Sequence, residues 1–181
     1  MKKDATRTGD WFVTYTGLKF WPFDPTPDDI VIEDIAHALS QICRFGGHTS
    51  QFFSVAQHSV LVSEIVPPAL ALQGLLHDAT EAYCGDMVRP LKVGLPSYEA
   101  VEDKIWQAIA KRYDLPVKLS KVIKWADNTL LMTERRDILR HVEHKWSLEL
   151  EGYKPLPDRI EPLSPEASET LFFNCFTKLY A

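Results

Sequence analysis

The sequence predicts an all-α fold, a helical bundle preceded by a short N-terminal β-hairpin. Apolar residues recur at intervals of three and four over several long stretches, which is the period of a helix with one buried face. Alternation of aromatic and β-branched residues, the pattern of a strand, is confined to residues 11–21. The 181 residues suffice for one domain, 1–181, with a substantial core.

The predicted hairpin has Thr16-Gly17 as its turn. A lone hairpin is marginally stable, so it should pack on the helices. Prolines 22, 25 and 27 should then keep the chain extended. We expect helices over residues 32–43, 54–66, 69–83, 98–113 and 117–141, and a last helix beginning at Ser164-Pro165. The intervening segments 87–92 and 146–165 are expected to be a loop and an irregular proline-rich stretch.

The centre of the predicted 69–83 helix carries the first candidate site. At about 100° per residue, His77, Asp78 and Glu81 share one sector beside an apolar stripe. An imidazole and two carboxylates supply the nitrogen and oxygen ligands of a divalent metal and a proton acceptor. On this stretch alone, an exposed polar face or a hydrogen bond from an N–H to a carboxylate is the more ordinary explanation.

Two further polar residues, His58 and Asp127, lie in apolar helical stretches, where an unpaired charge would cost several kcal/mol. A cation among His58, His77, Asp78 and Asp127 would compensate all four. This ligand set suits Co, Mn, Fe, Zn or Ni, with Mg also open. Outside the set, we expect His37 to be structural and residues 134–137 to form a salt-bridged solvent face.

A basic loop follows the first predicted helix. In the run Arg44-Phe45-Gly46-Gly47-His48, the glycines free the backbone and the arginine offers a planar fork for phosphate oxygens. An ordinary helix C-terminus also favours glycine and basic residues. Arg89 and Lys92 follow the candidate ligands closely, so a phosphate ester is the substrate class that these residues favour.

Composition excludes several classes of protein. The net charge of −5 argues against a stable complex with nucleic acid. No apolar run is long enough to cross a membrane. Residues 1–10 do not resemble a signal peptide, and three separated cysteines fit a reducing compartment, so we expect a cytoplasmic protein. Exposed aromatic residues of the hairpin and the last helix would favour a homo-oligomer.

The order His58, His77-Asp78, Asp127 resembles the HD-domain metal-dependent phosphohydrolases, whose metal lies in an all-α bundle. The segment 77–92 and the Arg-aromatic pair 44–45 are similar to the 5′-deoxynucleotidase branch, and the size is similar to the small phage dATP triphosphohydrolases. Phe45 stands where the bacterial deoxynucleotidases carry tryptophan.

The resemblance implies roles for the candidate residues. Glu81 would be the general base or acid, and Asp78 would also orient a water molecule. Substrate would be bound by Arg44, Phe45, His48, Asp86 and Lys92. Phe45 would be a sugar or base platform, and Asp86 would contact the 3′-hydroxyl or help to bind a second ion.

Three functions remain open from the sequence. The first is a deoxynucleoside triphosphate triphosphohydrolase, favoured slightly by the basic loops but mostly by the family resemblance. The second is a 5′-nucleotidase of nucleoside monophosphates. The third is a non-catalytic metal-binding helical module, against which the presence of Glu81 counts because a structural metal needs no base.

Overall fold

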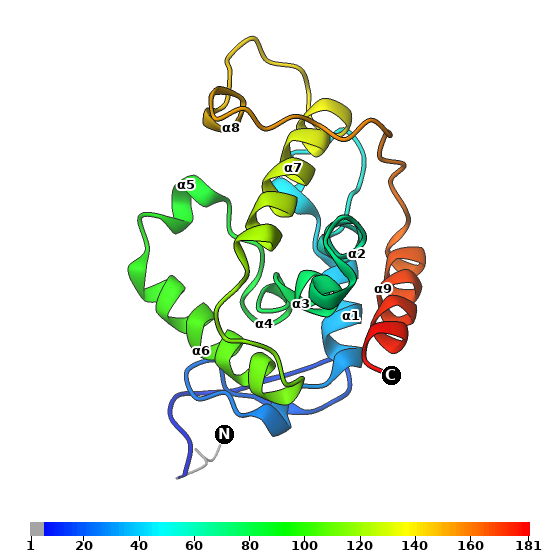
Figure 1. Cartoon of the computed structure of the whole chain (residues 1–181). Helices are drawn as coiled ribbons and strands as arrows, with labels where there is room; N and C mark the ends of the chain where they lie inside the picture. The colour runs from blue at the N-terminus through cyan, green and yellow to red at the C-terminus, as the bar shows by residue number, and fades with distance from the viewer. Residues whose placement is uncertain (1–5) are drawn as a thin grey trace.

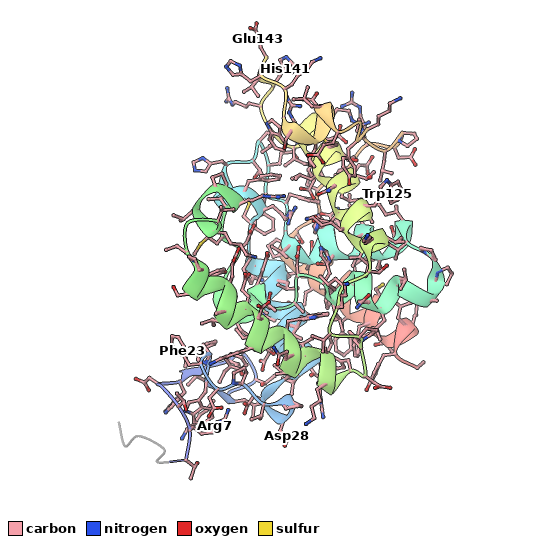
Figure 2. The ribbon with its side chains drawn as sticks, turned by 60° about the vertical axis from the view of Figure 1, so that its left-hand side comes forward. Arg7, Phe23, Asp28, Trp125, His141 and Glu143 are labelled. Atoms are coloured by element: carbon pink, nitrogen blue, oxygen red, sulfur yellow. The ribbon has the colours of Figure 1, made fainter. Side chains whose placement is uncertain are left out.

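The computed structural model describes residues 6–181. It confirms the all-α class: helices form the body, and the only strands among the described residues are those of a two-stranded hairpin near the N-terminus. The N-terminal segment lies at one end of the body and helix α8 (Ser147–Leu150) at the other (Figure 1). Figure 2 shows the same polarity, with Arg7 and Phe23 opposite His141 and Glu143. The prediction that residues 1–10 form no signal peptide falls partly outside the described residues.

The hairpin is confirmed. Strands β1 (Phe12–Val13) and β2 (Lys19–Phe20) pair antiparallel, with Phe12 opposite Phe20. Gly17 supplies the turn with φ of +86°, a conformation that L side chains rarely adopt. Phe20 is fully buried and its ring stacks on Tyr83 at 4.1 Å, so the hairpin packs on the helical body as expected.

The helices enclose one main core. In the part of the chain that the structure describes, the helical segments, with 3₁₀ turns labelled η, have the following bounds: η1 (Pro27–Asp29), α1 (Ile32–Gln41), η2 (Arg44–Gly47), α2 (Val55–Ile65), η3 (Pro68–Leu70), α3 (Ala71–Leu76), α4 (Glu81–Cys84), α5 (Arg89–Lys92), α6 (Pro96–Arg112), α7 (Lys121–Asp137), α8 (Ser147–Leu150) and α9 (Pro165–Leu179). Helix α9 packs against α1, α2 and α3, and α2 packs against α1, α3 and α7. Helix α6 lies on the opposite flank of the body from α9 (Figure 1).

Serine caps begin three of the longer helices. Ser54, Ser120 and Ser164 each accept a hydrogen bond from a backbone N–H of the first turn of α2, α7 and α9. The predicted starts at residues 54 and 164 are therefore confirmed. Among the described residues, no helix has the length and apolar character needed to span a membrane.

The predicted continuous helix over residues 69–83 is wrong. It is divided into η3, α3 and α4, and residues 77–80 form a tight turn between α3 and α4. Ala79 N–H bonds to the Leu76 carbonyl and Glu81 N–H to the Asp78 carbonyl, three residues back instead of four. His77 and Thr80 keep right-handed helical dihedrals, which is why the apolar periodicity runs through the turn unbroken.

Three other boundaries differ from prediction. Helix α7 (Lys121–Asp137) is shorter than the predicted 117–141, and the Ser120 cap fixes its start. The expected loop 87–92 contains the short helix α5, which begins with Pro90 in its first turn. The irregular segment 146–165 contains one further turn of helix, α8.

Gly74 allows α3 to approach α2 closely. A Cβ at this position would lie 3.2 Å from Cγ2 of Val66 and 3.3 Å from Cα of Ser63. Alanine favours a helix over glycine by about 1 kcal/mol. Overpacking costs about 1–3 kcal/mol, and the Ser63 backbone cannot rotate away, so the clash should outweigh the gain.

We therefore expect Gly74→Ala to lower the melting temperature by a few degrees, about 2–4 °C per kcal/mol for a chain of this size. Gly94→Ala is the matched control, because the Cβ there would meet its nearest neighbour, the Leu91 carbonyl oxygen, only at 3.4 Å. Thermal unfolding followed by circular dichroism measures both. A Gly74→Ala variant as stable as the control would show that the two helices move apart at little cost.

The C-terminal end of α7 fastens the proline-rich segment to the body. Asp137 accepts hydrogen bonds from the Arg136 guanidinium at 2.7 Å and from the Ile160 N–H at 3.0 Å. Arg136 also donates to the carbonyls of Leu156 and Asp158. The Asp137 side chain is only 3% exposed, so the predicted solvent face is wrong at this residue. Besides the adjacent Arg136, its carboxylate is satisfied by Ile160, 23 positions further along the chain, and a local sequence pattern cannot reveal that second contact.

This contact predicts a pH dependence of stability. The hydrogen bond from Arg136, with that from Ile160, lowers the pKa of Asp137 in the folded chain. A carboxyl with a depressed folded pKa contributes stability above its unfolded pKa of about 3.9, and loses it as pH falls through the folded value. We expect Asp137→Asn to cost roughly 1–2 kcal/mol at pH 7 and less below pH 4. Urea unfolding of both proteins at pH 7, 5 and 3 measures this, and a difference independent of pH would contradict it.

Candidate metal centre

Two histidines face each other at the junction of α2 with the turn after α3. His58 lies in the first half of α2 and is fully buried, and the ring centroids of His58 and His77 are 5.4 Å apart. The His77 side chain is 5% exposed. The tight turn between α3 and α4 directs His77 toward α2.

Hydrogen bonds fix the orientation of both rings. The Nδ1 of His77 donates to the Gly74 carbonyl at 2.7 Å, and the Nδ1 of His58 donates to Oε1 of Glu134 at 2.5 Å. A carbonyl and a carboxylate only accept, so each Nδ1 carries a proton, and the neutral form of each ring, which is the form that binds a metal, has its lone pair at Nε2. Neither Nε2 has a hydrogen-bond partner within residues 6–181, although both are buried.

Two carboxylates face these nitrogens. Asp78 Oδ2 lies 3.2 Å from Nε2 of His77 and 3.6 Å from Nε2 of His58. Asp127 Oδ1, on α7, lies 3.5 Å from Nε2 of His58. The structure thus brings together the four residues that the sequence suggested as ligands, from α2, the 77–80 turn and α7.

The cluster could hold a metal ion. One ligand atom each from His58, His77 and Asp127 lies within 4.8 Å of the other two. Buried imidazole nitrogens that have no partner and face carboxylates are satisfied together if a cation lies between them. The donor set of nitrogen and carboxylate oxygen suits a divalent transition metal.

The electrostatics of the cluster agree with this reading. Burial and Arg44 would lower the pKa of His58, but the carboxylates of Glu134 and Asp127 raise it to about 9. Burial would raise the pKa of Asp78, but the neighbouring His77 and His58 hold it below its usual value. These groups therefore attract positive charge strongly, and a proton and a metal cation would compete for the same atoms.

Glu134 contradicts the prediction of a solvent face. It lies on α7 and is fully buried. Its Oε1 accepts from His58, and its Oε2 accepts from the Arg44 guanidinium at 3.0 Å. The one available signal was its spacing of seven residues, two helical turns, from Asp127, which places both on one face of α7. The adjacent Arg135 and Arg136 concealed that signal by suggesting a surface cluster.

Arg44 reaches the centre because the segment before α2 folds back on the start of that helix. The backbone N–H of Arg44 donates to the Phe53 carbonyl at 2.9 Å, and the backbones of Cys43 and Ser54 form an isolated antiparallel β-bridge. The buried guanidinium contacts Glu134 and lies 3.6 Å from Oδ2 of Asp78. Its position next to a candidate metal ligand is suited to binding an anion held by that metal.

Phe45 has an unusual backbone conformation. Its φ of +56° lies in the left-handed region, and Gly46 and Gly47 follow with positive φ. The Arg44 guanidinium lies 5.5 Å from the centre of the Phe45 ring. Such strain in a bulky residue costs about 1–3 kcal/mol and concentrates at functional sites.

Glu81, in the first turn of α4, is the candidate proton-transfer group. It is 9% exposed, and its Oε2 is buried without a hydrogen-bond partner in the described part of the chain. Burial raises the pKa of Glu81 well above its usual value, and the charges of Asp78 and Asp86 raise it further, against Arg44 and Lys92. A carboxyl with a raised pKa can hold or release a proton nearer to neutral pH.

A pocket of about 350 Å³ opens beside the cluster, within the size range of small-ligand sites. Its lining includes His77, Asp78, Glu81 and Asp127, together with aromatic, acidic and basic side chains of α5, α6 and α7: Lys92, Glu102, Asp103, Trp106, Lys121, Lys124. The Nζ of Lys124 bonds to Oδ2 of Asp127 at 2.7 Å. The sequence analysis did not assign Lys121 and Lys124 to the site, because lysines in the first turn of a helix give no signal of what they face.

The remaining predicted substrate-binding residues differ in burial and in whether they line the pocket. Asp86 is half-buried after α4, where burial raises its pKa and Arg44 opposes the rise. Lys92 lines the pocket and is paired with Glu102 of α6 at 2.6 Å. His48 is exposed and is absent from the pocket lining, so the structure does not bring it to the cluster.

No family model matches the chain. The chain is similar to the uncharacterized protein YfdR of Escherichia coli K12, with 45% identity over 168 residues that cover 92% of this chain and 93% of YfdR. An uncharacterized protein of Rhodobacter capsulatus is 39% identical over 126 residues, 64% of each chain. By its identity and coverage with YfdR, the chain belongs to the YfdR family.

Proposed function

We propose that the protein is a metal-dependent phosphohydrolase of deoxynucleotides. The observation that carries the proposal is the convergence of His58, His77, Asp78 and Asp127 beside a pocket. Glu81 lines the same pocket, and its buried Oε2 has no hydrogen-bond partner among the described residues. A divalent cation held there would polarise a phosphoryl oxygen and acidify a water molecule. The resemblance to HD-domain phosphohydrolases supports the same chemistry.

Side chains of the protein would transfer the proton and bind the substrate. Glu81 would accept a proton from the attacking water or give one to the leaving oxygen. Arg44 would bind a phosphate oxygen and stabilise the negative charge that grows in the transition state. Asp86 would accept a hydrogen bond from the sugar, and Phe45 would contact its ring face.

Deoxynucleoside triphosphates are the substrates that the pocket favours. Three lysines, Lys92, Lys121 and Lys124, line it, and the buried Arg44 lies 3.6 Å from Oδ2 of the lining residue Asp78, so more cationic side chains are available than a single phosphate requires. Hydrolysis would break the bond between the α-phosphorus and O5′, releasing nucleoside and triphosphate. A 5′-nucleotidase breaks the equivalent bond of a monophosphate, and the pairing of Lys92 with Glu102 favours this second candidate because it removes one cation from the phosphates.

A chromatographic assay distinguishes the candidates. Purified protein is incubated with Co²⁺ or Mn²⁺ and a panel of ribo- and deoxynucleoside mono-, di- and triphosphates. Nucleoside plus triphosphate supports the first function, and nucleoside plus orthophosphate from monophosphates alone supports the second. If no nucleotide is hydrolysed while Co²⁺ binds, the centre is a non-catalytic metal site and the proposal is wrong.

A further inference from the structure

Glu134 joins two groups that the proposed reaction needs for different purposes. One carboxylate oxygen accepts from Nδ1 of His58, and the other accepts from the Arg44 guanidinium. His58 is a candidate metal ligand, and Arg44 is a candidate phosphate contact. From this geometry we infer that Glu134 is a positioning residue, which sets the ligating nitrogen of His58 and the orientation of Arg44 at the same time.

The effect on His58 follows from the acceptor character of a carboxylate. With Nδ1 held as a donor, the lone pair of the neutral ring is fixed at Nε2, on the side of Asp78 and Asp127. A carboxylate behind a ligating imidazole also increases its basicity, and loss of such a partner costs about 10–100-fold in metal affinity.

The effect on Arg44 follows from burial. Its guanidinium is held by Glu134 on one side and faces Asp78 on the other. Without Glu134 the buried cation would lose its closest counter-charge and would be drawn toward Asp78, which it now approaches only to 3.6 Å. An arginine paired with Asp78 would compete with the metal for that carboxylate and would be less available to a phosphate.

The alternative is that Glu134 is only a structural ion-pair partner in the core. That role would lower stability on substitution but would leave the metal affinity of the folded protein unchanged. The inference rests on the proposed metal site, but its test needs no turnover.

The test is a titration of metal-free protein with Co²⁺, by calorimetry, for the wild type and Glu134→Gln. We expect the variant to bind Co²⁺ about 10–100-fold more weakly, and to show a raised KM for the substrate found in the nucleotide assay. Glu149→Gln is the matched control, because Glu149 also pairs with an arginine of α7, Arg135, but lies outside the centre. Equal Co²⁺ affinity in folded wild type and Glu134→Gln would overturn the inference.

A second pair of variants keeps the test possible if Glu134→Gln does not fold because Arg44 is left without its counter-charge. Arg44→Gln and the double variant Arg44→Gln/Glu134→Gln then replace the pair, since removing both buried charges avoids the penalty of leaving one. The double variant should still bind Co²⁺ more weakly than Arg44→Gln alone, and equal affinities would overturn the inference. Wild type that binds Co²⁺ but hydrolyses no nucleotide would refute the proposed function alone.

Discussion

Replacing Glu81 by glutamine should lower kcat by about 10²–10⁴-fold, the usual contribution of general acid–base catalysis. Glutamine has nearly the same shape but cannot exchange a proton. Since Oε2 of Glu81 has no hydrogen-bond partner within the described residues, the substitution breaks no hydrogen bond of that atom. Folding and Co²⁺ affinity should therefore stay close to those of the wild type.

Initial rates and Co²⁺ titrations of Glu81→Gln measure this separation of chemistry from metal binding. The matched control is Glu99→Gln, which makes the same substitution on the exposed face of α6. A Glu81→Gln variant with wild-type turnover would exclude Glu81 as the proton-transfer group. Loss of Co²⁺ binding together with turnover would make it a metal ligand instead.

Replacing Asp127 by alanine should remove Co²⁺ binding and turnover together. Outer partners of metal ligands already contribute about 10–100-fold to affinity, so loss of a ligand should cost on the order of 100-fold or more. Asp127 supplies the oxygen that α7 directs at His58, and Lys124, now paired with it, would be released into the pocket. Excess Co²⁺ should restore part of the activity if weakened binding is the cause.

Metal content after dialysis and rates over a range of Co²⁺ concentrations measure this effect. Asp28→Ala is the control, since Asp28 is an exposed carboxylate at the N-terminal end of the molecule (Figure 2). Full metal content and full activity in Asp127→Ala would contradict the assignment of the centre.

Local patterns predicted those parts of the fold that local energetics determine. The helix from Ser54 and the helix from Ser164 were correctly placed because a cap and an apolar period act within a few residues. The hairpin was found from alternation and a Thr-Gly turn. The break at residues 77–80 was missed because His77 and Thr80 keep helical dihedrals while the hydrogen bonds of the turn span three residues instead of four.

The candidate site was predictable where residue type carried the signal. Histidines and aspartates in apolar stretches are conspicuous, and the structure gathers all four. Glu134 was not conspicuous, since a glutamate among arginines suggests a surface until its partners are known. Those partners lie 76 and 90 residues earlier in the chain, beyond the reach of any periodic pattern.

The same separation determines when the centre can form during folding. Burying Glu134 before His58 and Arg44 arrive would cost several kcal/mol, so its carboxylate must remain hydrated until α7 docks on α2. The contacts close chain segments of 76 and 90 residues. Such long-range closure lowers the rate of docking strongly, but it lowers the stability of the docked state only a little, because the entropic cost rises only with the logarithm of segment length. Dehydration of the site and docking of α7 are thus one event, and a local opening of α7 would dismantle the metal ligands, the arginine and their shared carboxylate as a single cooperative unit.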